Sequence, residues 1–267
     1  MYLPETCLMR PSYTLLRYLC LALTLIANGF ALAETTLVKS YNTYLFPPFV
    51  TNNGGLAVEL VNYLNQKLAN EYRFQLFNVP RSRLVRGPLK DETSLDGIVL
   101  FLNPRFVDDA NQQHFLWTPA LFSDSNVLVF RGPTAPIIKD LKALQGMRFG
   151  AVLENRYRGI DELTKARTIS RIDGTSELNN LKLLQANRID FTLMGLSTFT
   201  ALSRDNLIDE SLATSPPPDD PAFTRHILVN KKQPELAKRL FAIVTNMASD
   251  PYWQDILERY QLELKHH

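Results

Sequence analysis

Apolar stretches of strand length alternate with stretches of helical periodicity along the chain, and this order constrains the fold most. Leu56, Leu60, Leu64 and Leu68 recur at helical spacing, and a weaker helical pattern covers residues 81–89. The order β-α-β-α-β results, which is typical of a parallel sheet with helices on its faces. Its predicted strands lie before, between and after the two helices, at residues 37–40, 72–79 and 98–102.

The same order returns further along the chain. A helix is predicted at residues 158–165 and another begins at Ser176. Asp96 and Asp190 each stand shortly before an apolar strand that follows a helix. We interpret the two halves as related α/β lobes. The strands of the second half are predicted at residues 147–153, 168–172 and 189–194.

Two further strands connect the predicted lobes. One, at residues 126–130, leaves the first lobe, and the other, at 226–229, returns to it before two helices that begin near Pro234 and Pro251. Two connecting strands form a hinge, and such hinges let lobes close over a ligand. We therefore predict an α/β fold of two lobes, each a mostly parallel sheet flanked by helices. Lobe one comprises residues 34–131 and 226–267, and lobe two comprises residues 132–225.

The N-terminal residues have the build of a secretory signal peptide. Arg10 and Arg17 give a positive region, the apolar run at 18–27 is too short to span a membrane comfortably, and residues 31–33 form a small-x-small cleavage signal. We expect cleavage after Ala33 and a periplasmic mature protein. The alternative is a retained membrane anchor.

Composition excludes several function classes for the mature chain. Removal of 33 residues from 267 leaves 234, enough for two small domains with real cores. Cys7 and Cys20 both lie in the removed segment, so no thiol remains for a disulfide, a metal site or a nucleophile. The remaining 27 basic and 26 acidic residues argue against a nucleic-acid partner. Zincin, P-loop, nucleophile-elbow and dinucleotide motifs are absent, so we expect neither a cofactor, a metal nor an enzyme.

Several short motifs resemble the periplasmic solute-binding proteins of the amino-acid type, the bacterial extracellular solute-binding protein family 3. These motifs are YLFPPFVTNNGGLAVELVNYL, SLDGIVLFLNPR, FLWTPALFSDSNVLVFRG, DLKALQGMRFGAV and LKLLQANRIDFTLM, in the order of the family. The resemblance implies the two-lobed periplasmic binding protein fold (type II), with a cleft between the lobes for a small polar solute. It also implies a monomer that docks on an inner-membrane ABC permease or a sensor protein. Ligand groups are expected in loops after strands, because open α/β sheets bind ligands beyond the carboxyl ends of their strands.

By this resemblance, Arg105 takes the place of the arginine that grips the ligand's α-carboxylate with two parallel hydrogen bonds. An ordinary loop arginine is the alternative. Hydrophobic residues stand where the family has hydroxyl groups before this arginine. Aromatic rings suit the wall of a partly wet cleft, although packing in the core is the alternative for each ring. The ligand-binding residues predicted in lobe one are Arg105, Tyr44, Tyr41, Phe101, Arg81 and Trp117.

In lobe two the chain departs from the family pattern. Glu154, Asn155 and Arg156 stand where the family places a hydroxyl-rich loop, and all three are predicted to bind the ligand. Gly195 stands where the family often has the aspartate that holds an ammonium group, and whether Glu154 replaces that aspartate stays open. Two alternatives stay open. One is a periplasmic enzyme of the cyclohexadienyl-dehydratase type with Glu154 beside Arg156 as its acid–base group, and the other is an interaction or sensory module.

Overall fold

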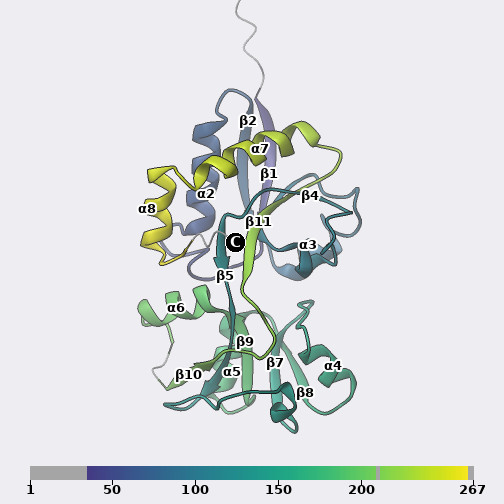
Figure 1. Cartoon of the computed structure of the whole chain (residues 1–267), viewed down its shortest axis with the longest axis vertical. Coiled ribbons are helices and arrows are strands. Elements are labelled where there is room, and N and C mark those ends of the chain that lie inside the picture. The colour runs from purple at the N-terminus through teal and green to yellow at the C-terminus, as the bar shows by residue number, and fades with distance from the viewer. Residues whose placement is uncertain (1–34, 209–210, 264–267) are drawn as a thin grey trace, which may run out of the picture.

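Two α/β lobes form the molecule, stacked along its long axis and joined by extended strands (Figure 1). The structure is a computed structural model that describes residues 35–208 and 211–263. The predicted fold class is confirmed, whereas the predicted signal peptide and its cleavage site lie outside the described residues. In the two described ranges, no helix is long and apolar enough to cross a membrane.

The sheet of lobe one has three parallel strands at one side and antiparallel strands at the other. β1 (Thr36–Asn42) lies parallel to β2 (Tyr72–Asn78) and to β3 (Gly97–Leu102). β11 (Phe223–Val229) runs antiparallel to β3 and to β4 (Leu116–Trp117), which gives the order β2-β1-β3-β11-β4. The parallel part confirms the β-α-β-α-β order predicted for the first half of the chain.

Helices cover both faces of this sheet. α2 (Leu56–Lys67), α7 (Pro234–Met247) and α8 (Pro251–Arg259) contribute Leu60, Leu240 and Trp253 to the larger core, and none of these side chains meets solvent. α3 (Arg81–Arg86) packs Leu84 on the smaller core of the other face. Burial of each such side chain contributes about 1.5–3 kcal/mol. Every residue of β3 is buried, because both faces of the strand are covered.

Lobe two repeats the plan around the sheet order β10-β6-β9-β7-β8. Strand β7 (Arg148–Val152) lies between β8 (Ser170–Gly174) and the central strand β9 (Phe191–Gly195) and is parallel to both. Two cores, one on each face, are formed with α4 (Ile160–Lys165), α5 (Glu177–Gln185) and α6 (Leu196–Arg204). β6 (Asn126–Arg131) and β10 (Leu212–Ser215) complete the sheet as antiparallel strands.

Two segments cross between the lobes side by side. β5 (Phe122–Asp124) leads into β6, and the segment after β10 leads back into β11, while β5 and β11 pair with each other (Figure 1). β6 belongs to the second sheet, although the predicted division at residue 131 placed its residues in lobe one. The division into lobes otherwise stays a prediction. The crossing strands bring the two sheets end to end, so the loops that follow their strands face one another.

Candidate functional site

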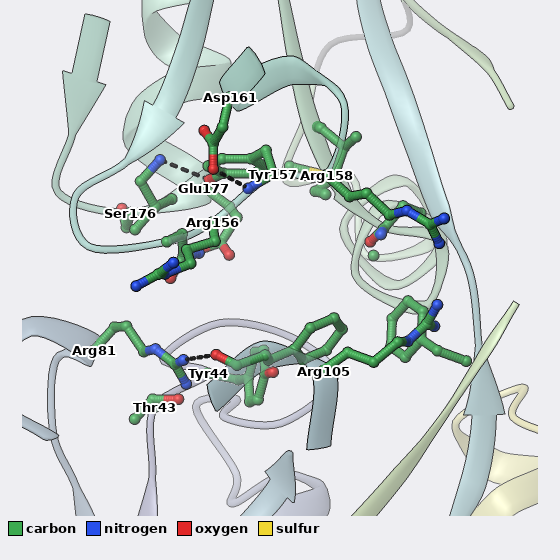
Figure 2. A pocket seen from close by; sticks show the side chains of 18 of the residues that line it. Thr43, Tyr44, Arg81, Arg105, Arg156, Tyr157, Arg158, Asp161, Ser176 and Glu177 are labelled. Atoms are coloured by element: carbon green, nitrogen blue, oxygen red, sulfur yellow. Dashed lines mark hydrogen bonds between the residues drawn. The ribbon is translucent and has the colours of Figure 1, made fainter. Parts of the chain in front are cut away.

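A cleft of about 430 Å³ lies between the lobes and is lined by residues of both. Its lobe-one wall comes from the loops after β1, β2 and β3, and its lobe-two wall from the segments after β7, β8 and β9. This position agrees with the rule that ligands bind beyond the carboxyl ends of strands. Figure 2 shows the walls as two opposed rows, with Arg81, Tyr44 and Arg105 in one and Arg156, Tyr157 and Glu177 in the other.

Arg105 lies in the lobe-one wall, immediately after β3. The Oδ1 atom of Asn103 accepts hydrogen bonds from the backbone N–H of Arg105, at 3.0 Å, and from its Nε, at 3.4 Å. Asn103 is in turn fixed by a 2.8 Å hydrogen bond from its Nδ2 to the carbonyl of Thr224 in β11. No carboxylate of the described residues pairs with the Arg105 guanidinium, so its planar fork is free to bind an anion.

Tyr44 lies in the same wall and is held from two sides. The side chain of Asn42, at the end of β1, accepts from the Tyr44 N–H at 3.1 Å and donates to the Tyr44 carbonyl at 3.0 Å. The guanidinium of Arg225 lies 4.5 Å from the centre of the Tyr44 ring. A cation over an aromatic face at this distance is attracted by the ring. The loop after β1 therefore presents a fixed aromatic surface to the cleft.

Arg81 opens α3 and reaches the cleft wall from the end of β2. Its Nη2 donates a 2.6 Å hydrogen bond to the carbonyl of Phe106, whereas its buried Nε has no acceptor among the described residues. Burial lowers the pKa of Arg81 from its ordinary value, although Tyr44 and Asp108 act in the opposite direction. A half-buried cation without a carboxylate partner is a group that an anionic ligand would stabilise.

Arg225 and Asp124 form a buried ion pair at the base of the cleft, where β11 and β5 cross between the lobes. Arg225 donates to the Asp124 carboxylate from Nε at 2.9 Å and Nη2 at 2.7 Å, and from Nη1 to the Phe101 carbonyl at 3.1 Å. Asp124 also accepts from the backbone and the hydroxyl of Ser197, which opens α6. This pair was not predicted from the sequence. The alternating residues of β11 that point inward are Phe223, Arg225 and Ile227. A charged residue in such an apolar row indicates a buried ion pair and is the signal that could have revealed Arg225.

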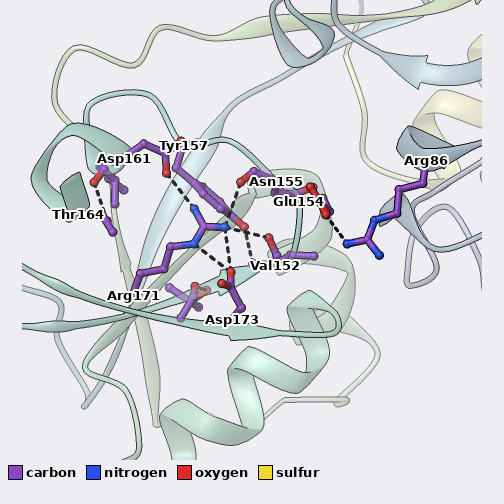
Figure 3. Close-up of polar contacts among 12 residues, drawn as sticks. Arg86, Val152, Glu154, Asn155, Tyr157, Asp161, Thr164, Arg171 and Asp173 are labelled. Atoms are coloured by element: carbon purple, nitrogen blue, oxygen red, sulfur yellow. Dashed lines mark hydrogen bonds and ion pairs between the residues drawn. The ribbon is translucent and has the colours of Figure 1, made fainter. Parts of the chain in front are cut away.

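Asn155 and Arg156 lie in the lobe-two wall as predicted, but Glu154 does not. Arg171 fixes the loop through bonds to the carbonyls of Val152 and Asn155 (Figure 3). Glu154 points toward lobe one, where it forms a 2.6 Å ion pair with Arg86. Arg156 forms a second pair with Asp108 of lobe one, at 3.1 Å. The pair with Arg86 argues against the ammonium-binding role left open for Glu154, because its carboxylate is engaged outside the cleft wall.

Glu177 is the acidic residue at the start of α5 and lies in the cleft wall. It was not among the residues predicted from the sequence. Ser176 caps this helix, since its hydroxyl accepts from the backbone N–H of Asn179 at 3.2 Å. Apart from its own backbone N–H, no described residue hydrogen-bonds to the Glu177 carboxylate. Burial raises its pKa to about 7, although its own backbone N–H and the charge of Arg225 lower it. A search of the loop after the strand predicted at 168–172 would have found it.

Three other predicted ligand-binding residues lie in the core of lobe one and not in the cleft wall. The hydroxyl of Tyr41 donates to Asp96 at 2.7 Å, and the indole Nε1 of Trp117 donates to Asp109 at 2.7 Å. Phe101 is fully buried against Phe49, with ring centres 5.1 Å apart. The polar atoms of Tyr41 and Trp117 and the ring of Phe101 therefore have their partners within lobe one. Among the described residues, no cluster of His, Cys, Asp and Glu is suited to hold a metal ion.

Comparison with known proteins places the fold. No family model and no curated protein matches the sequence, but solved structures match over most of the chain. An ancestral arginine-binding protein bound to arginine is similar at TM-score 0.69 and 15% identity, over 84% of this chain and 97% of that one. The chain has the two-lobed fold of the amino-acid-binding proteins. The fold implied by the resemblance to solute-binding proteins is thus confirmed.

Two further structures share this two-lobed fold. A putative L-cystine ABC transporter protein from Listeria monocytogenes has a TM-score of 0.67 and 16% identity, over 85% of this chain and 96% of that one. The GluR0 ligand-binding core from Nostoc punctiforme, in complex with L-glutamate, has a TM-score of 0.65 and 13% identity, over 84% of this chain and 98% of that one. Both comparisons therefore extend over the two lobes and the cleft between them.

Proposed function

We propose that this chain is a periplasmic solute-binding protein that closes over a small polar, carboxylate-bearing solute, an amino acid or a related compound. The observation that carries the proposal is the Arg105 guanidinium, which lies in an interlobe cleft, fixed by Asn103 and without a carboxylate partner among the described residues. A guanidinium fits a carboxylate with two parallel hydrogen bonds, each contributing roughly 1.5–3 kcal/mol. Similar structures bound to arginine and to L-glutamate support a ligand of this class.

The proposed setting follows from the proposed role. The chain works as a monomer in the periplasm, after loss of the predicted signal peptide, and binds neither nucleic acid nor a cofactor. Its loaded form docks on an inner-membrane ABC permease or on the outer part of a sensor protein. The putative cystine ABC transporter protein among the similar structures supports the first partner.

A thermal-shift screen tests the binding role. Amino acids, organic acids and amines are added in turn to the purified protein. A ligand at about 100 times its Kd stabilises the folded state by about 2.7 kcal/mol, so a true ligand raises the melting temperature clearly. If none of the three panels shifts the melting temperature, the binding role is contradicted and the interaction module gains support.

Substitution of Arg105 tests the site. Arg105→Ala is expected to keep the melting temperature of the ligand-free protein and to weaken binding of the carboxylate solute at least tenfold, a loss of about 1.4 kcal/mol or more. Arg73→Ala is the matched control, because Arg73 is also exposed but lies in β2 outside the cleft wall. Calorimetric titration measures both variants. Unchanged affinity in Arg105→Ala removes Arg105 from the site.

An enzyme on the same fold is the second candidate, and one observation favours it. Glu177 lies in the cleft with a pKa of about 7, as a general acid or base requires near neutral pH. Glu154, the acid–base group predicted from sequence, is held by Arg86 outside the cleft. Incubation with prephenate discriminates between the two candidates. Turnover that Glu177→Gln abolishes supports the enzyme, and absence of turnover supports the binding protein.

A further inference from the structure

Two guanidinium groups of lobe one face the cleft without an acidic partner. Arg81 and Arg105 both line it, and neither forms an ion pair with a carboxylate of the described residues. In Figure 2 they lie on either side of Tyr44, in the same row. Arg158 of lobe two lines the opposite wall, also without a carboxylate partner in the described chain. Like charges in one cleft repel, and an anionic ligand relieves the repulsion.

The two lobe-one cations are unequally exposed, which indicates that each has its own partner group in the ligand. Arg105 is exposed and has only Asn103 beside it. Arg81 lies deeper, with one bond to the Phe106 carbonyl and a buried Nε without an acceptor. The Nη1 atom of Arg81 is not buried in this way and donates no hydrogen bond to a described residue. It is therefore available to a second anionic group on the ligand, and such a pair forms well only with good geometry.

The acidic residues of the cleft are poorly placed to hold an ammonium group. Asp161 accepts from Nη1 of Arg171 and from the backbone N–H of Tyr157, both at 2.9 Å. Asp220 accepts from Asn126. Glu162 also lines the cleft, but its side chain is exposed to solvent, which weakens its attraction for an ammonium group. Glu177, with a pKa of about 7, carries a full negative charge only above neutral pH, and below it can donate a proton to an anion. The polar groups of the cleft therefore favour ligand anions over ligand cations.

We propose that the cleft binds a solute with two anionic groups, such as a dicarboxylate, in which Arg105 holds one group and Arg81 the other. This inference rests on the proposed binding function and specifies its substrate class. Each guanidinium presents parallel donors that match a carboxylate in a bidentate way. Specificity then comes from Arg81, because a solute with a neutral amide in place of its second carboxylate leaves this half-buried cation unpaired.

Matched solutes of equal size test the proposal by calorimetric titration. Glutarate is compared with its monoamide, and L-glutamate with L-glutamine, so each pair differs only in the second carboxylate. Succinate and adipate vary the separation between the two carboxylates. The wild-type protein is expected to prefer the dianion of at least one pair tenfold or more. Arg81→Gln is expected to reduce that preference to less than about threefold, mainly through weaker binding of the dianion.

Arg83→Gln is the matched control, because Arg83 lies in the same helix but is exposed and outside the cleft wall. It is expected to keep the preference. Arg81→Lys keeps the charge and loses the planar fork, so it serves if Arg81→Gln folds poorly, and intermediate weakening is expected. If the wild type binds dianion and amide with equal affinity, or if both Arg81 variants keep the preference for the dianion, the two-anion inference is wrong but the proposed binding function still holds. If no solute of either class binds the wild type, the proposed function fails as well.

Discussion

Glu177 combines a cleft position with a pKa far above its ordinary value of 4.5. The folded state binds the Glu177 proton more tightly than the unfolded state does, so the protonated side chain stabilises the fold. This contribution to stability is complete below about pH 4.5. That contribution is lost as the pH rises through about 7, where the confined carboxylate ionises. We therefore predict that Glu177→Gln, without ligand, raises the melting temperature relative to wild type more at pH 8 than at pH 5.

Thermal melts of both proteins at several values between pH 5 and pH 8 measure this difference. Glu162→Gln is the control, because Glu162 also lines the cleft but is exposed. It measures any effect that is common to the loss of a carboxylate from the cleft wall. A Glu177→Gln effect that does not change with pH would mean that the carboxylate titrates near its ordinary value.

The buried ion pair of Arg225 and Asp124 connects strand β11 to strand β5. Asp124 also accepts a hydrogen bond from Ser197, so the same pair contacts helix α6. Removal of one partner leaves an uncompensated buried charge, which typically costs 3–5 kcal/mol. We predict that Arg225→Met lowers the free energy of unfolding by about this amount. Urea denaturation followed by circular dichroism measures it.

Replacement of both partners provides the internal check. Because Arg225→Met together with Asp124→Leu leaves no buried charge, the double variant is expected to be more stable than Arg225→Met alone. Glu71→Gln is the external control, since its pair with Arg239 is exposed and such pairs contribute about 0–1 kcal/mol. A loss in Arg225→Met no larger than in Glu71→Gln contradicts the assignment of Arg225 as a structural anchor.

The elements that the sequence predicted well are those with strong periodicity. α2, α7 and α8 repeat apolar residues at helical spacing, and β3 is an uninterrupted buried run. α6 was missed, because its sequence LSTFTALSR mixes hydroxyl and apolar residues and its Ser197 is fixed by a distant aspartate. β4, β5 and β10 span only two to four residues, too few for a periodic pattern.

The candidate site was predictable where a residue follows a strand directly, as Tyr44, Arg81 and Arg105 do. The direction in which a side chain points was not predictable, because it depends on partners that are distant in sequence. Glu154 turns to Arg86 of the other lobe, and Trp117 turns to Asp109 in its own lobe. The resemblance placed the cleft correctly in the fold but gave no indication of such departures.

Two ion pairs join one lobe to the other: Arg86 with Glu154, and Asp108 with Arg156. Exposed pairs contribute about 0–1 kcal/mol each, too little to affect folding but enough to change a balance between open and closed lobes severalfold. We predict that Glu154→Gln with Asp108→Asn leaves the unfolding midpoint nearly unchanged and increases the radius of gyration of the ligand-free protein.

Small-angle X-ray scattering measures that radius. Glu59→Gln is the control, because its pair with Arg259 lies within lobe one and its loss is expected to leave the radius unchanged. If the double variant has the radius of the wild type, the two pairs do not influence lobe closure.

Closure over a carboxylate solute is the central claim, and a crystal structure with the tightest-binding solute of the thermal-shift panels tests it most directly. We expect solute density between the lobes, with one carboxylate within hydrogen-bond distance of the Arg105 guanidinium and the ring of Tyr44 beside it. Density outside the interlobe cleft, or a carboxylate that does not contact Arg105, would show that Arg105 does not bind the solute as proposed.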